Sequence, residues 1–144
     1  MNHPFLEGFL LEFRLPFADV FIDRNAGVLM VRYQESTAID LSMGQHLVDS
    51  IYPFLKQGID LGMTDATANY LSISKEARRF YSNNKSIALT KAHAIIVKSL
   101  SVRLLANFFV NFDNPIVPTK VFNEFSDANK WLLKSRSFKQ NVRI

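Results

Sequence analysis

The stretch from residue 58 to residue 80 constrains the fold of this chain most strongly. An apolar run at residues 59–65 ends in Asp65, a polar turn follows at 66–70, and a helical pattern opens at Ser74. This order of a short apolar run, a turn and a capped helix is typical of a strand that feeds a helix. Open α/β folds collect ligands and partners at the carboxyl ends of their strands, so the stretch also predicts where a site lies.

The segment before this unit predicts an antiparallel start. Residues 8–15, 17–23 and 28–33 are rich in strand-forming side chains, and residues 24–27 hold Asn25 and Gly27, which suit a tight turn. From Asp40 onward apolar residues recur at three- and four-residue spacing, which predicts an amphipathic helix capped by Asp40 or Ser42. We expect Pro53 to kink this helix or to end it.

The second half of the chain repeats the alternation of strand and helix. Residues 86–98 predict a strand whose inner part, 92–97, is apolar except for His93 and is therefore central in the sheet. His93 is interpreted as a core or interface histidine rather than a catalytic base. Ser99 or Ser101 is expected to cap the next helix, and Ser126 the last one. Residues 117–125, with Pro118 near the start, predict an edge strand between these two helices.

These elements predict a single α/β domain with a mixed sheet, antiparallel at first and then joined by βα crossovers. Its helices are expected to pack mainly on one face of the sheet. We place the domain at residues 1–135 and a basic tail at 136–144. The formal charge of +4 supports this division, because five of the 17 cations follow residue 129 and the part before them holds 12 cations against 13 acids.

Composition excludes several classes of function. The chain has no Cys, so a disulfide framework, a thiolate nucleophile and a Cys-ligated zinc site are ruled out. The near-neutral body argues against nucleic acid as a partner. No leader or membrane-spanning run is recognisable, which favours a cytoplasmic protein. No catalytic triad, paired-carboxylate motif or phosphate-binding glycine loop can be assembled, and we therefore expect no enzyme activity, no cofactor and no metal site.

Three stretches resemble the STAS domain of anti-sigma-factor antagonists, and more closely the STAS-like bacterial proteins related to them. They are Met63-Thr64-Asp65 with Ser74-Lys75-Glu76-Ala77-Arg78; residues 92–99 with residues 103–108; and residues 118–122 with residues 128–132. The resemblance covers most of the chain and implies the fold already inferred. It also implies a regulatory, non-catalytic role with a kinase or an anti-sigma-type regulator as protein partner.

In that family a Ser that follows an Asp at the start of this helix is phosphorylated. Here Ser74 stands at the place of the Asp and Lys75 at the place of the phosphoacceptor. Two interpretations of Ser74 stay open, a helix cap and a phosphorylated switch, since a phosphate is also favoured at a helix N-terminus. If their strands are parallel neighbours, the loops after Asp65 and residue 97 share one edge of the sheet. The candidate partner-binding or phosphoacceptor residues are Asp65, Thr67, Asn69, Ser72, Ser74, Ser99, Ser101, Arg103 and Asn107.

Three classes of function stay open, of which an enzyme is the least favoured. One is a regulatory protein-interaction module with a switch at the edge after Asp65. Another is a binder of a small amphipathic or lipid-like ligand, suggested by the 13 Phe residues. A large apolar cavity favours the ligand binder, whereas a filled core with an exposed polar edge favours the module. We also expect a homodimer, because Phe9, Phe13, Phe17 and Phe21 lie in strands that would leave apolar surface or an open sheet edge.

Overall fold

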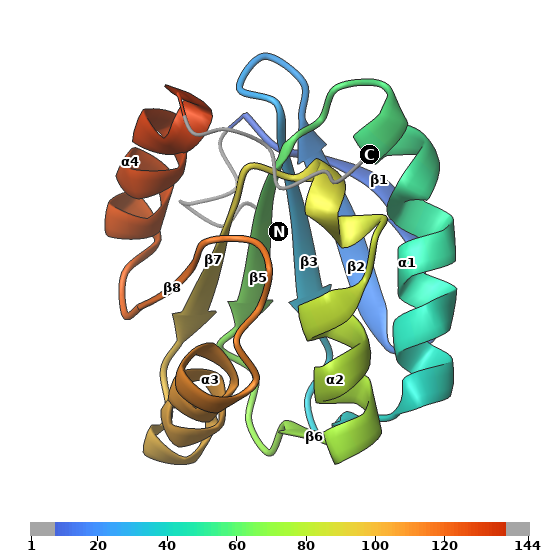
Figure 1. Cartoon of the computed structure of the whole chain (residues 1–144), viewed down its shortest axis with the longest axis vertical. Helices are drawn as coiled ribbons and strands as arrows, with labels where there is room; N and C mark the ends of the chain where they lie inside the picture. Colours follow the sequence, from blue (N-terminus) through green and yellow to red (C-terminus); the bar gives the residue numbers. More distant parts are fainter. Residues whose placement is uncertain (1–7, 138–144) are drawn as a thin grey trace.

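A mixed sheet of six strands forms the centre of the protein in the computed structural model, which describes residues 8–137 (Figure 1). The strands lie in the order β1-β2-β3-β5-β7-β8. β1 pairs with β2 and β2 with β3 in antiparallel fashion, and the remaining pairs are parallel. The strands are β1 (Leu10–Arg14), β2 (Ala18–Asp23), β3 (Val28–Tyr33), β5 (Leu61–Ala66), β7 (Ala92–Val97) and β8 (Thr119–Phe122). This is the predicted fold, with β7 inside the sheet and β8 at its edge.

The helices follow the predicted alternation. They are α1 (Leu41–Lys56), α2 (Lys75–Asn83), α3 (Leu100–Phe112) and α4 (Phe125–Lys134). Asp40, Ser74 and Ser99 each accept a hydrogen bond from a backbone N–H in the first helical turn, so these three predicted caps are confirmed. Within residues 8–137 there are also two short 3-10 helices, η2 (Ile87–Leu89) and η3 (Ser135–Ser137).

Four local expectations were wrong or incomplete. Residues 87–89 form η2 instead of the first half of a strand, because Asn84 and Thr90 hydrogen-bond Ile87 and fix a turn there. α1 does not end before Pro53 but continues to Lys56, and the backbone N–H of Gln57 still bonds to carbonyls of the last turn. α4 begins at Phe125 with Glu124, not Ser126, at the cap position. A small parallel pair, β4 (Ala38–Ile39) and β6 (Ser72–Ile73), was not foreseen.

Alternating side chains along each strand divide the core into two layers. On β3, Val28 and Met30 belong to one apolar cluster, whereas Leu29, Val31 and Tyr33 belong to the other. The same alternation separates the side chains of β5 and β7. Both faces of the sheet are therefore covered, as expected for parallel strands with apolar residues on both sides.

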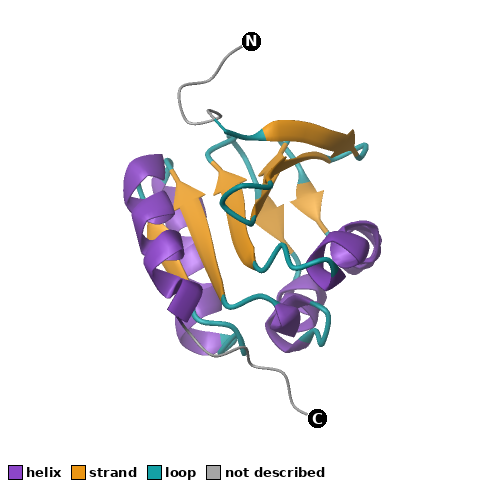
Figure 2. Ribbon diagram, turned by 90° about the horizontal axis from the view of Figure 1, so that it is seen from above, coloured by secondary structure: helices purple, strands orange, loops and turns teal. Residues whose placement is uncertain are grey.

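Three helices cover one face of the sheet and a single helix covers the other. Buried residues of α1, α2 and α3 join one cluster, which we call the three-helix face, and those of α4 join the other, the α4 face. Figure 1 shows α2 and α3 in front of the strands, and Figure 2 shows the strands between helices on either side. This agrees with the expectation that the helices pack mainly on one face.

The phenylalanines of the first strands are mostly covered. Phe9, Phe17 and Phe21 are buried, and Phe13 stacks on Phe54 of α1 with 6.0 Å between ring centroids. β1 is nevertheless an open edge of the sheet, where the side chains of Leu10 and Leu11 are exposed. Among residues 8–137, none of the helices has the length and apolar character needed to cross a membrane. Most of the predicted basic tail lies outside the described residues.

Candidate functional site

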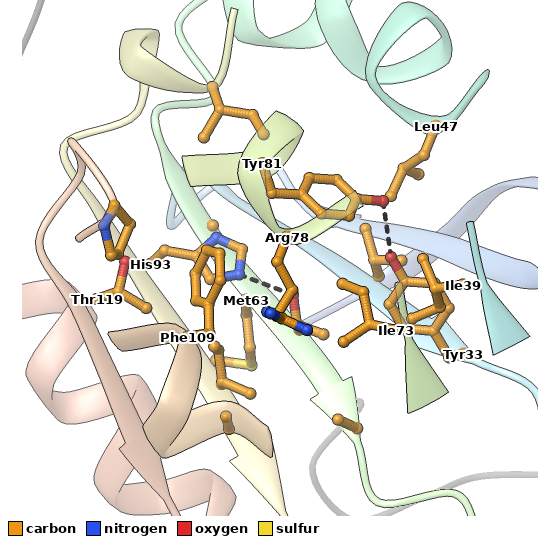
Figure 3. Close-up of a pocket in the computed structure, with 18 of the residues that line it drawn as sticks. Tyr33, Ile39, Leu47, Met63, Ile73, Arg78, Tyr81, His93, Phe109 and Thr119 are labelled. Atoms are coloured by element: carbon orange, nitrogen blue, oxygen red, sulfur yellow. Dashed lines mark hydrogen bonds between the residues drawn. The ribbon is translucent and has the colours of Figure 1, made fainter. Parts of the chain in front are cut away.

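An apolar cavity of about 180 Å³ lies on the three-helix face, between the sheet and α1, α2 and α3 (Figure 3). Its floor is made by β3, β5 and β7, and its walls include Leu47 of α1, Tyr81 of α2 and Phe109 of α3. Ile39 of β4 and Ile73 of β6 close one side, so the small unforeseen sheet belongs to the wall. The lining is almost entirely apolar, which is the usual character of a small-molecule site.

Small side chains explain why this face is not filled. β5 presents Gly62, Thr64 and Ala66 to the three-helix face, and all three line the cavity. From α3, only Val102 and Ala106 are buried, whereas Leu105 and Phe109 are partly accessible because they border the cavity. Small residues on the floor and on the facing helix leave a volume that neighbouring side chains do not reach.

Two tyrosines form the first polar feature of the cavity. The hydroxyl oxygens of Tyr33 on β3 and Tyr81 on α2 lie 3.1 Å apart and share a hydrogen bond. Burial raises the pKa of Tyr81 to about 12 and holds the pKa of Tyr33 well above its usual value, because the charged phenolate would lose its hydration. Both groups are therefore uncharged hydroxyls around neutral pH.

His93 and Thr64 form the second polar feature. His93 Nε2 lies 2.7 Å from Thr64 Oγ1, across the neighbouring strands β7 and β5. A Cβ atom on Gly62 would come within 2.6 Å of His93 Nδ1, so glycine is needed for the ring to lie over β5. Burial lowers the pKa of His93 from 6.5 to about 4, which leaves the imidazole neutral near pH 7. The interpretation of His93 as a hydrogen-bonded core histidine agrees with this geometry.

Arg78 is the charged residue of the lining, and it joins α2 to the end of α3. Its Nε donates a hydrogen bond of 2.9 Å to Asp113 Oδ2, and its guanidinium lies 4.9 Å from the ring centroid of Phe108. Both members of this ion pair are largely buried. The pair closes the gap between two of the helices that cover the cavity and compensates the positive charge there.

The predicted edge after Asp65 exists, but Asp65 is a buried structural group. The residue is 1% exposed, and its carboxylate accepts hydrogen bonds from Arg32 Nε at 2.9 Å and from Thr67 Oγ1 at 2.7 Å. Thr67, Asp19 and Arg32 line a second, more open depression beside it. Asn69 follows on the exposed loop. Asp65 therefore holds the turn after β5 in place, and the accessible polar atoms of this edge come from its neighbours.

The serines predicted for the same edge lie at two helix starts. Ser74 Oγ accepts a hydrogen bond from Ala77 N at 3.1 Å, and Ser99 Oγ accepts one from Val102 N at 3.2 Å. Ser101 Oγ lies 3.4 Å from Ser99 Oγ, and Ser72 is exposed on β6 beside the cavity. Because β5 and β7 are parallel neighbours, the loops after them do end at the same edge, as predicted.

The predicted candidates Arg103 and Asn107 lie on α3 and differ in burial. Asn107 is exposed, whereas Arg103 Nε is buried and has no hydrogen-bond partner among the described residues. Sequence reasoning missed the polar groups that do meet, the Tyr33–Tyr81 and Arg78–Asp113 pairs, since their members are separated by 48 and 35 positions along the chain. No motif marks either pair. Among residues 8–137, no group of three His, Asp or Glu side chains is placed to hold a metal ion.

Comparisons with known proteins support this fold. The chain is similar in structure to an uncharacterised protein of the DUF3478 family from Shewanella loihica PV-4, which has a SpoIIAA-like fold. The TM-score is 0.53 at 16% sequence identity, over 86% of this chain and 91% of the other. The likeness extends to the STAS-like fold alone, and no curated protein matches the chain. A family model described as a domain of unknown function matches residues 21–136. The chain therefore belongs to the DUF7793 family.

Proposed function

We propose that the protein is a non-catalytic binding domain that holds a small, mainly apolar molecule in the cavity of the three-helix face. The cavity itself carries this proposal, because an apolar cavity distinguishes a ligand binder from a module with a filled core. Its lining brings together residues from β3, β5, β7 and three helices, so a ligand there would contact most of this layer.

The size of the cavity supports binding over a simple packing defect. The cavity is lined by apolar side chains that lack packing partners on the side that faces it. A bound molecule would recover the lost contacts. For scale, a dry engineered cavity of about 150 Å³ binds benzene.

The polar groups of the cavity support binding without a reaction. The Tyr33–Tyr81 hydroxyls bond to each other, His93 is neutral and bonded to Thr64, and Arg78 is paired with Asp113. Each group is held by a partner from another element, which suits a wall that positions a ligand.

Filling the cavity tests the proposal. Ala106→Leu adds volume at a buried position of α3 that lines the cavity, whereas Ala38→Leu adds the same atoms at an exposed position of β4. Small apolar compounds should raise the melting temperature of the wild type and of Ala38→Leu, but not that of Ala106→Leu. Equal shifts in all three proteins would contradict binding in this cavity.

A second candidate function, protein interaction, is favoured by the outer face of α3. Leu100, Leu104, Phe108 and Phe112 recur every four residues along the helix, and all four are exposed. The rings of Phe108 and Phe112 stack with 4.7 Å between centroids. A helix that is apolar on its inner and outer sides is normally covered on both. The expected homodimer therefore has a plausible contact surface here.

A second copy of this chain is the occupant that we propose for this face. Two α3 helices packed antiparallel about a two-fold axis would place Leu104 against Phe108 and Leu100 against Phe112. The positive Lys98 before one helix would then approach the negative C-terminal end of the other. We expect a dimer by sedimentation at tens of micromolar wild type and a monomer for Leu104→Asp. A wild type that stays monomeric, or binds only a different protein, would refute this surface as a dimer contact.

The regulatory role implied by the STAS-like resemblance stays a prediction at Ser72 and Ser74. Phosphopeptide mapping, and partner recovery with Ser72→Asp and Ser74→Asp, would test it. A switch predicts altered binding of the recovered kinase or anti-sigma-type regulator. Unchanged binding in both variants, with no phosphate on either serine, would leave capping as the one supported role of Ser74. In that case Ser74→Ala should lower the free energy of unfolding by about 0.5–2 kcal/mol, whereas Ser74→Asp should preserve it because Asp also caps a helix.

A further inference from the structure

The chemistry of the cavity wall narrows the class of ligand. The inference about the ligand rests on the proposed function and concerns which small molecules the cavity accepts. Four of the residues that line it are titratable: Tyr33, Arg78, Tyr81 and His93. No Asp or Glu is among the lining residues. The charge state and the partners of these four groups decide whether a charged ligand finds a counter-charge.

Three of the four present no charge to the cavity. The hydroxyls of Tyr33 and Tyr81 share one hydrogen bond, 3.1 Å long, and burial keeps both groups protonated and uncharged. His93 is neutral near pH 7 and is bonded to Thr64. A cationic ligand would therefore enter a cavity without any carboxylate to pair with, and would lose its hydration uncompensated.

The fourth group is already neutralised. Arg78 is held by Asp113 through Nε and by the ring of Phe108, and the pair is largely shielded from water. An anionic ligand at Arg78 would lie close to the Asp113 carboxylate, and the two like charges would repel each other. The Arg78–Asp113 pair thus acts as a neutral unit in the wall.

Thr64 offers a hydrogen-bonding position to a ligand on the floor of the cavity. A threonine hydroxyl offers one donor and two acceptor sites, and the contact with His93 Nε2 uses one of them. Thr64 sits at the middle of β5, on the floor of the cavity, where its side chain keeps some accessible surface although the strand is central in the sheet. A hydroxyl or carbonyl group of a ligand can bond to it there.

We propose that the cavity selects uncharged molecules of about six to ten non-hydrogen atoms, with an apolar body and one hydroxyl or carbonyl group bonded to Thr64. Long-chain lipids exceed this size, and ionised acids or amines lack a free counter-charge. The ligand class is narrower than the amphipathic or lipid-like molecule expected from the sequence.

Three matched compounds test the selection against charge. Benzyl alcohol, benzoate and benzylamine share one ring and differ in charge at about pH 7.5. Titration of the whole protein, followed by NMR or calorimetry, should show that benzyl alcohol binds about tenfold or more tightly than either ion. Benzoate or benzylamine binding as well as the alcohol would overturn this inference and leave the proposed function intact. Binding of none of the three, with Ala106→Leu and wild type indistinguishable, would overturn both.

A second comparison tests the role of Thr64. Thr64→Val keeps the shape of the side chain and removes its hydroxyl. The variant should bind benzyl alcohol about two- to tenfold more weakly, because one hydrogen bond is lost, and should bind toluene as the wild type does. Equal affinities of both proteins for benzyl alcohol would refute the hydrogen bond to Thr64. Equal losses for toluene and benzyl alcohol would refute it as well, since they would assign Thr64 to the shape of the wall alone.

Discussion

The two faces of the sheet differ in packing, although the same strands supply both. On the α4 face, Met30, Met63 and Ile96 meet Ala128 and Leu132, and all five side chains are almost completely buried. On the three-helix face, β5 contributes Gly62, Thr64 and Ala66, and the helices above them leave the cavity. A single helix fills the face on which the strands carry large apolar side chains. Three helices leave a cavity on the face on which β5 carries small side chains. The number of helices over a face thus says little about how well that face is filled.

The largest expected effect belongs to the filled face. Leu132 of α4 has no exposed surface, so Leu132→Ala should leave a void among rigid neighbours and cost about 2–5 kcal/mol. Denaturant unfolding would measure it. Leu105→Ala on α3 is the matched change on the three-helix face, where the side chain already borders the cavity and a smaller loss is expected. Equal losses at both positions would contradict the contrast between the faces.

The next effect is a pH dependence that comes from the cavity side. The pKa of His93 is lowered to about 4 from 6.5, so between these values the unfolded chain binds a proton that the folded protein does not. Stability should therefore fall as the pH drops from about 6.5 to 4, by about 3 kcal/mol from this group. Because other groups titrate in the same pH range, the loss of stability in wild type is compared with the loss in His93→Gln, which lacks the imidazole. The account fails here if wild type and His93→Gln lose the same stability between pH 7 and pH 4.

The smallest expected effect on stability comes from an Ala→Leu substitution, made once on each face of the sheet. Ala128→Leu adds atoms to the filled face and should cost about 1–3 kcal/mol through overpacking. Ala106→Leu adds the same atoms beside the cavity and should be neutral or slightly stabilising. Thermal unfolding of the two variants, side by side, measures the difference. A cost at Ala106 as large as that at Ala128 would mean that the cavity cannot accept added atoms.

Local patterns predicted the fold well because its signals lie close together in the chain. Asp40, Ser74 and Ser99 each mark a helix start within three residues of the N–H that they cap. The apolar run of β7 is likewise complete within six residues. Where the strand pattern failed, a local hydrogen bond fixed the backbone in another shape. The side chain of Asn84 accepts this bond from the N–H of Ile87 at the start of η2.

The cavity was not predictable in the same way. It depends on small residues of β5, Gly62 and Ala66, lining the same space as Ala106 of α3. No local pattern in the sequence records that small residues from distant segments will meet. The same holds for Arg78 and Asp113, which are joined only because α2 ends up beside the end of α3. The abundance of Phe suggested a ligand binder, yet most Phe residues of the first strands are packed in the core.

The most direct test of the central claim is a titration of methyl-labelled protein with benzyl alcohol, followed by NMR. Val31, Ile39 and Ile95 line the cavity, whereas Val28, Ile96 and Leu132 belong to the α4 face. The account predicts saturable shifts of the first three methyl sets and unchanged signals from the second three. Shifts of equal size on both faces, or none on either up to millimolar concentrations, where weak binding still registers, would contradict it.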